Sequence, residues 1–218
     1  MSTTSINVDL TDPSKIYIYH ITDVSNLNSI IAGGGLKSDA ALATQQASGQ
    51  VNGIGYSHIK TRRLTQTKVN CCNGRFVGEF VPFYFCPRSP MLYTVNRGNT
   101  GKPVGSQATI VHLVSSMSIG MSQQRDWAFS DVSAATGYPN FFNNPKDLNQ
   151  LDWDAIKSTN WSGKSTQKQA EFLVADHFDW SGVLEIGCMS LVVTSQVQQI
   201  IGQSAHQPVV KTKSDWYY

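Results

Sequence analysis

The stretch Lys168-Gln169-Ala170-Glu171-Phe172-Leu173-Val174 predicts a buried strand, because a short apolar run follows a single carboxylate at its leading end. Glutamate is rarely buried without a partner, since removing an ionised carboxylate from water costs several kcal/mol. Glu171 therefore either marks the wet end of the strand and points at solvent, or has a partner elsewhere in the chain and a function. Residues in other segments favour the second interpretation.

Length and composition predict a single domain over residues 1–218. The chain has no apolar run long enough for a membrane span, and its polar first 15 residues do not read as a secretory signal. We therefore expect a cytoplasmic protein. Its four cysteines form no C-x-x-C pair, so neither a metal site nor a disulfide framework is predicted.

Positive charge is concentrated in one segment, although the net charge is only +2. Eight of the 17 Lys and Arg residues lie between positions 51 and 105, together with only one of the 15 Asp and Glu residues. Such a segment indicates a local anion site for the phosphates of a nucleotide or of a nucleic acid. The alternative is a solvated loop whose lysines provide solubility.

Strands outnumber helices in the predicted elements, which gives an α+β class. Alternating aromatic and β-branched residues predict a first strand at 16–21. Further strands are predicted at 76–85, 109–114, 127–130, 168–174, 183–189 and 208–212, and helices at 27–31, 151–158 and 195–201.

Irregular structure is predicted in three places. Residues 40–55 are small and polar and predict a mobile loop, and residues 131–150 predict a loop long enough to be functional. Pro82, Pro87 and Pro90 predict an extended, turned path without regular helix over 81–92.

Three groups of side chains are candidates for a binding site. His20 and Thr22, at the end of the first strand, could bond ribose hydroxyls or a carboxamide, or His20 could simply be a half-buried residue bonded to backbone. The Arg62-Arg63 pair suits phosphate, and on a strand only one of the two would enter a cleft. The loop aromatics (Tyr138, Phe141 and Phe142) are either anchors or platforms for a nucleic-acid base.

Seven motifs lie in order over nearly the whole chain. They are Tyr19-His20-Ile21-Thr22 with Asn26-Leu27; Tyr56-Ser57-His58-Ile59 leading to Arg62-Arg63; Val81-Pro82-Phe83-Tyr84-Phe85-Cys86-Pro87-Arg88-Ser89-Pro90-Met91-Leu92; Val111-His112-Leu113-Val114-Ser115-Ser116; Leu151-Asp152-Trp153; Lys168-Gln169-Ala170-Glu171; and Asp215-Trp216-Tyr217-Tyr218. Together they resemble one protein family, the DarT toxins of bacteria, which ADP-ribosylate DNA.

The resemblance implies an ADP-ribosyltransferase fold: a split β-sheet core with flanking helices, a cleft for NAD between its halves, and a long substrate-recognition loop from about residue 130 to 171. It implies transfer of ADP-ribose from NAD, the co-substrate, to a thymidine base in single-stranded DNA. It also implies a partner, the macrodomain antitoxin DarG, which removes the modification.

Matched positions imply a role for individual residues. Glu171 and Arg63 are implied as catalytic, and His20 as holding the nicotinamide side of NAD. The positions implied to bind NAD are Tyr19, His20, Ile21, Thr22, Asn28, Leu36 and Arg63. No metal is implied.

The chemistry of this reaction suits those residue types. Cleavage of the nicotinamide–ribose bond passes through an oxocarbenium-like cation, which a carboxylate at Glu171 would stabilise better than an amide. A guanidinium is effectively always protonated, so we expect Arg63 to give electrostatic support to a thymine anion, with Glu171 or water relaying the proton.

Two other functions remain open from the sequence. A non-catalytic binder of single-stranded nucleic acid would use the basic segment and the loop aromatics. An NAD glycohydrolase would share the NAD cleft but pass ADP-ribose to water.

Overall fold

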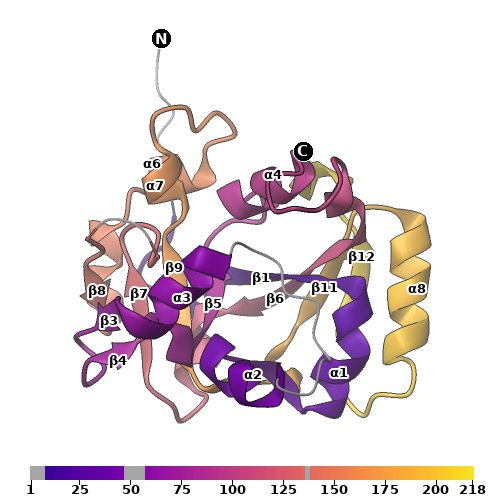
Figure 1. Cartoon of the computed structure of the whole chain (residues 1–218), viewed down its shortest axis with the longest axis horizontal. Helices are drawn as coiled ribbons and strands as arrows, with labels where there is room; N and C mark the ends of the chain where they lie inside the picture. Colours follow the sequence, from indigo (N-terminus) through magenta and orange to yellow (C-terminus); the bar gives the residue numbers. More distant parts are fainter. Residues whose placement is uncertain (1–7, 47–56, 136–137) are drawn as a thin grey trace.

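A computed structural model describes residues 8–46, 57–135 and 138–218, which surround one eight-stranded sheet (Figure 1). Within these ranges no helix has the length and apolar character needed to cross a bilayer. The strand order is β12-β11-β6-β1-β5-β9-β7-β8. The strands are β1 Tyr17–Asp23, β5 Phe80–Tyr84, β6 Ile110–Ser116, β7 Trp127–Ser130, β8 Phe141–Phe142, β9 Glu171–Ala175, β11 Glu185–Cys188 and β12 Val209–Thr212.

The sheet is split between β1 and β5. Strand β1 pairs with β6 over its whole length, and β5 pairs with β9 from Phe80↔Ala175 to Tyr84↔Glu171. In contrast, β1 and β5 pair at a single position, Tyr19↔Tyr84. Because the two strands separate beyond that pair, the sheet consists of two halves joined at one residue of each.

Short helices surround the sheet, and α8 flanks its β12 edge (Figure 1). The helices are α1 Leu27–Ala32, α2 Asp39–Gln46, α3 Ser57–Thr65, α4 Pro90–Asn96, α5 Met117–Met121, α6 Trp153–Lys157, α7 Ser165–Lys168 and α8 Leu191–Ile201. Two-stranded sheets are formed by β2 Gly35–Lys37 with β10 His177–Asp179, and by β3 Lys68–Val69 with β4 Arg75–Phe76.

Gly35 allows β2 to approach β10. Its φ is +148°, and a Cβ added there would lie 2.1 Å from the carbonyl oxygen of Phe178. No other residue type fits such a position, because both the backbone conformation and the contact exclude a side chain.

Large apolar side chains fill the interior on both halves of the sheet. The main cluster contains fully buried phenylalanines from β5, β9 and β10, among them Phe83, Phe172 and Phe178. A second cluster lies around Phe80 and Leu173, and a third packs the end of the chain against α4 and β6. The core therefore fixes both strands that flank the split.

The structure confirms most predicted elements. The strands predicted at 16–21, 109–114, 127–130 and 208–212 correspond to β1, β6, β7 and β12. The strand predicted at 168–174 begins later, at Glu171, because Lys168 still belongs to α7.

Three local predictions are wrong. Helix α2 (Asp39–Gln46) includes residues 40–46 of the predicted 40–55 loop, and residues 47–55 lie outside the described part of the chain. Pro90 starts helix α4 instead of preventing it, because a proline at the first helical position needs no N–H partner, and Ser89 caps the helix. Arg62 and Arg63 lie on helix α3 and not on a strand.

Candidate active site

Glu171 begins β9 with its side chain buried, although it carries a carboxylate. Only 3% of the residue is exposed. Its Oε2 accepts a hydrogen bond from Nη1 of Arg63 at 2.8 Å, and its Oε1 accepts one from the backbone N–H of Ala134 at 3.0 Å. The interpretation that Glu171 points at solvent is therefore wrong, and both carboxylate oxygens have fixed partners.

The start of the 131–150 loop is tied to the same carboxylate. The backbone N–H of Glu171 donates to Oγ of Ser130 at 3.2 Å, and that hydroxyl donates to the carbonyl of Val132 at 2.6 Å. The N–H of Ser133 donates to the carbonyl of Thr166. These bonds hold the Ala134 N–H in position, a contribution that no side-chain motif in the sequence could reveal.

Arg63 reaches Glu171 from helix α3 and is itself buried, with 7% of the residue exposed. Burial alone would lower the pKa of Arg63, but the charge and hydrogen bond of Glu171, together with the charge of Asp39, raise the pKa overall. Its second terminal nitrogen, Nη2, is buried without a hydrogen-bond partner among the described residues. A buried donor in this state is costly unless a ligand pairs with it.

Tyr84 on β5 is the neighbour of Glu171 on the adjacent strand. It lies directly opposite Glu171 in the β5–β9 ladder, so the two side chains share one face of the sheet. Burial and the Glu171 carboxylate both raise the pKa of the Tyr84 phenol, which is therefore a neutral donor at physiological pH.

His20 lies at the split and bonds to the opposite strand. Its Nδ1 is 2.8 Å from the carbonyl oxygen of Pro82, and its ring packs edge-on against Phe83. Since a carbonyl only accepts, Nδ1 carries the proton and Nε2 is left as an acceptor. Burial is the main cause that lowers the pKa of His20, and the charge of Arg63 adds to it. His20 forms no hydrogen bond with Arg63 or Glu171. It contacts Pro82 on β5, and β5 in turn pairs with β9, which carries Glu171.

Asp39 is a charged neighbour that the sequence did not single out. It lies in the first turn of α2, and its Oδ1 is 3.6 Å from Nζ of Lys60 on α3. Its negative charge raises the pKa of both His20 and Arg63. The three groups thus belong to one electrostatic neighbourhood.

The neighbours of His20 face in alternating directions along β1. Tyr19 packs edge-on against Trp216 at 5.4 Å between ring centroids, and Ile21 packs in the same cluster at the end of the chain. Thr22 is buried, and its Oγ1 accepts a hydrogen bond from Asn26. The side chains of these three residues are therefore occupied by packing and hydrogen bonds within the fold.

The two remaining candidates, Asn28 and Leu36, do not join the Arg63–Glu171 pair. Asn28 is exposed on the first turn of α1. Leu36 is buried on β2, opposite Phe178, in the main apolar cluster.

The loop aromatics divide into two kinds. Phe142 stacks on Phe129 with ring centroids 5.4 Å apart, and Phe141 packs against the second apolar cluster, so both are anchors. Tyr138 is 99% exposed. The loop that presents it is closed by Asp131, which accepts hydrogen bonds from the backbone and side chain of Asn140.

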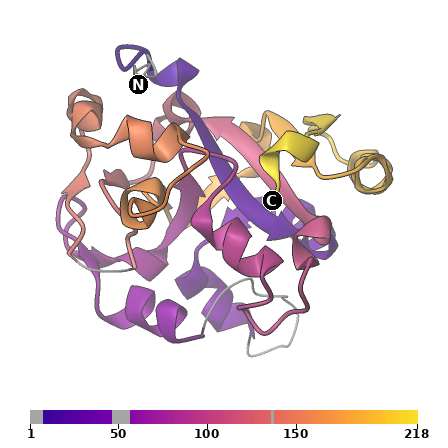
Figure 2. The same cartoon turned by 90° about the horizontal axis from the view of Figure 1, so that it is seen from above.

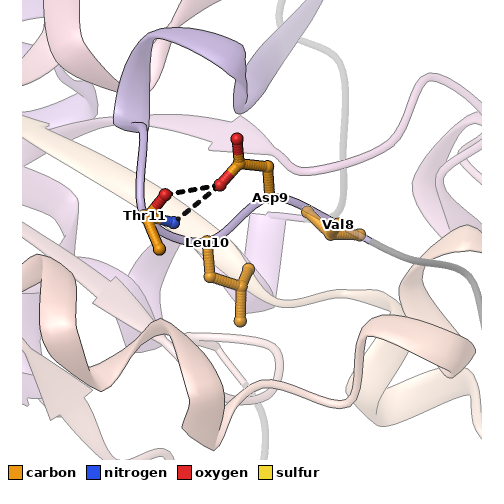
Figure 3. A pocket seen from close by; sticks show the side chains of 4 residues that line it. All are labelled: Val8, Asp9, Leu10 and Thr11. Carbon is orange, nitrogen blue, oxygen red and sulfur yellow. Dashed lines mark hydrogen bonds between the residues drawn. The ribbon is translucent and has the colours of Figure 1, made fainter.

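A cavity of about 590 Å³ near the start of the described chain is not part of this site (Figure 3). It is lined by Val8, Asp9, Leu10 and Thr11. The carboxylate of Asp9 accepts hydrogen bonds from the backbone and hydroxyl of Thr11 and pairs with Lys15, so its charge is already matched.

Comparison with known proteins identifies the family. Residues 19–218 match the family model described as ssDNA thymidine ADP-ribosyltransferase, DarT. The chain belongs to the DarT family. It is therefore an ADP-ribosyltransferase that acts on thymidine in single-stranded DNA. A DNA ADP-ribosyl transferase of Thermus aquaticus is 38% identical over 208 residues, which cover 94% of this chain and 90% of the relative.

Solved DarT structures from Thermus sp. 2.9 share the fold. The structure in complex with ADP-ribosylated ssDNA has a TM-score of 0.85 at 37% identity, and the match covers 94% of this chain and 97% of the Thermus chain. The structure in complex with NAD+ has a TM-score of 0.81 at 35% identity, and the match covers 95% of this chain and 98% of the Thermus chain. Both the predicted α+β class and the predicted family are confirmed.

Proposed function

We propose that the buried Arg63–Glu171 pair is the catalytic centre at which this DarT enzyme transfers ADP-ribose from NAD to thymidine. The observation that carries the proposal is the 2.8 Å contact between two buried charges from segments far apart in sequence. A buried ion pair is a poor device for stability, because the cost of desolvation offsets most of the attraction. Such a pair is better explained by chemistry that needs both charges.

Glu171 stabilises the positive charge that develops on ribose when the bond to nicotinamide breaks. Its carboxylate is held by Arg63 and by the backbone of Ala134, so it need not reorganise during the reaction. Removal of the negative charge of Glu171 should therefore slow the transfer far more than a change in the shape of its side chain.

Arg63 acts through its permanent charge. Its raised pKa makes it unsuitable as a proton acceptor, in agreement with the general behaviour of guanidinium. It lowers the cost of forming a thymine anion next to it, and Glu171 or a water molecule relays the proton from the base.

NAD fits the groups left without partners. The unpartnered Nη2 of Arg63 suits a phosphate or ribose oxygen, and Nε2 of His20 suits an N–H of the nicotinamide carboxamide. Backbone groups of Tyr19, Ile21 and Thr22 would hold the same end of the dinucleotide. Asn28 and Leu36 would lie further along it, where only the Asn28 side chain is exposed.

The loop from Ser130 to Glu171 would recognise the DNA. Tyr138 supports this assignment, because an almost fully exposed aromatic ring packs nothing in the fold and offers a face on which a base can stack. A DarG-type macrodomain would be the partner that removes the modification. The test is loss of label from the modified oligonucleotide when such a macrodomain is added.

One incubation tests the transferase against its alternatives. Purified protein is mixed with NAD labelled in the ADP-ribose moiety and a thymine-containing single-stranded oligonucleotide. Label in the oligonucleotide supports the proposal, and its absence with thymine replaced by cytosine supports the base assignment. Free ADP-ribose as the sole product would indicate a glycohydrolase, and intact NAD with bound oligonucleotide would indicate a simple binder.

A further inference from the structure

Three aromatic rings from distant parts of the chain meet beside helix α4. The ring of Tyr93 lies edge-on to Trp161 at 5.5 Å and to Tyr218 at 5.1 Å between centroids. All three residues are half-buried, so each keeps part of its surface open to solvent. We call Tyr93, Trp161 and Tyr218 the aromatic cluster.

Two guanidinium groups lie on these rings. The Cζ atom of Arg88 is 4.6 Å from the ring centroid of Tyr218, and that of Arg97 is 5.9 Å from the centroid of Tyr93. Two nearby lysines pair with carboxylates, Lys102 with Asp23 and Lys164 with Asp152. Within the described ranges, however, no carboxylate forms an ion pair with Arg88 or Arg97, and Nε of Arg88 is buried without a hydrogen-bond partner.

The aromatic cluster lies at the end of the sheet where Glu171 begins β9. Arg88 follows four residues after Tyr84, the cross-strand partner of Glu171, and Trp161 precedes α7, which leads directly into β9. From above, α4, the end of the chain and the α6–α7 segment lie next to one another (Figure 2). A strand of DNA leaving the reaction centre at this end would meet these rings.

We propose that the aromatic cluster, with Arg88 and Arg97, is a second contact surface for single-stranded DNA, which binds nucleotides flanking the modified thymidine. These half-buried rings keep aromatic surface open to solvent, on which bases can stack without regard to sequence, and guanidiniums without an ion pair can bind the phosphates between the bases. The surface thus supplies affinity for the strand, whereas the loop beside Glu171 selects the base. This inference rests on the proposed transfer to single-stranded DNA.

The test compares oligonucleotides that carry one thymidine and range from about four to about 16 nucleotides, the span of typical single-strand sites. The variants are Tyr93→Ala, Trp161→Ala and Arg97→Ala. Arg125→Ala is the matched control, because Arg125 is another half-buried guanidinium, which pairs with Asp179 near Trp127 and Val174 at the other end of β9.

We expect kcat/KM of the wild type to rise with oligonucleotide length. In the Tyr93→Ala and Trp161→Ala variants, kcat/KM on the longest oligonucleotide should fall by about five- to 150-fold. The fall should come from a higher KM for DNA, and the KM for NAD should not change. Arg97→Ala should reduce the slope of log affinity against log salt by about 0.7, the value for one phosphate contact on a single strand. Tyr93→Phe should restore the activity lost in Tyr93→Ala.

Three results would overturn the proposal. Equal losses at every length would mean that the rings only hold the fold, and unchanged kinetics would mean that the strand does not cross them. If Arg125→Ala had as large an effect as Arg97→Ala, the location of an arginine beside the aromatic cluster would not matter for DNA binding. If the wild type modified no oligonucleotide, the proposed function would fail, and direct binding of fluorescent oligonucleotides to the same variants would still test this surface.

Discussion

Two opposite charges buried 2.8 Å apart make Arg63 and Glu171 the most informative residues of the molecule. Removal of either side chain would leave the other charge buried and unpaired, which costs about 3–5 kcal/mol of stability. With alanine variants, a loss of activity could therefore come from unfolding or from loss of the catalytic group. Substitutions that keep the shape or the charge of the side chain distinguish these two causes.

Glu171→Gln should keep the hydrogen bond from Ala134 and lose the negative charge. We expect transfer of ADP-ribose to DNA to fall about 10²- to 10³-fold, the usual effect of removing one stabilising group from a transition state. Single-turnover transfer measures this loss, and the melting temperature controls for folding. Activity within a few-fold of the wild type would contradict the role of Glu171.

Arg63→Lys keeps the positive charge but loses the planar fork. Because we assign Arg63 a purely electrostatic role, part of the activity should remain, reduced by about tenfold to a hundredfold. The measurement is kcat for transfer alongside binding of NAD by calorimetry. Complete loss of transfer with intact NAD binding would instead indicate that the guanidinium itself takes part in moving the proton.

At the scale of elements, buried Lys168 connects α7, which precedes β9, to the end of α6. It ends α7, only 2% of it is exposed, and its Nζ donates to the carbonyls of Ile156 and Ser158 at 2.8 Å. These are carbonyls at the end of α6, which a cation at a helix C-terminus stabilises. The segment that carries Trp161 is thereby fixed relative to Glu171.

Lys168→Met should retain the packing of the aliphatic stem and leave those carbonyls without their donor. We expect the free energy of unfolding to fall by about 1–3 kcal/mol and KM for DNA to rise, because the loop loses its attachment. Denaturant titration and oligonucleotide kinetics measure the two effects. Lys211→Met, at an exposed lysine paired with Glu185, is the control. A stability equal to that of the wild type would count against this role.

Sequence patterns predicted the elements better than the site. Alternating aromatic and β-branched residues identified β1, and a continuous apolar run identified β6, whose residues are all buried. Helix α2 was missed although its alanines favour a helix, since small residues also suit a loop. The three-residue strands β2 and β10 carry too few positions for any period.

The candidate active site could be assembled from the sequence only through the family resemblance. Arg63 and Glu171 are 108 positions apart, and no spacing rule connects them. Asp39 gave no signal, because one acidic residue at a helix start is usually a solvated charge. The contribution of Ala134 is a backbone N–H, which every residue type except proline provides.

For the whole molecule, a fully buried histidine links stability to pH. His112 on β6 is 0% exposed, and its Nε2 donates to the carbonyl of Pro87 at 2.9 Å. Burial lowers the pKa of His112 to about 4, so the folded protein keeps it neutral. Below the ordinary value of 6.5 the unfolded chain binds a proton that the folded chain does not.

Stability should therefore be complete above pH 6.5 and fall as the pH drops toward about 4. The loss amounts to about 3 kcal/mol if His112 acts alone, and His20, whose pKa burial also lowers, adds to it in the same direction. Denaturant titrations from about pH 7 to about pH 4.5 measure this slope. His112→Gln, which does not titrate, should show a shallower slope, and an unchanged slope would refute the assignment to His112.

The hydrogen bond from the Ala134 backbone to Glu171 allows evolution to change one part of the enzyme without the other. Because the donor is main chain, the side chains of the neighbouring loop, which we propose to recognise the DNA, can change while the carboxylate stays anchored. Grafting that loop from a relative should thus transfer sequence preference and preserve turnover. Proline at position 134 is the one replacement that would abolish the anchor outright.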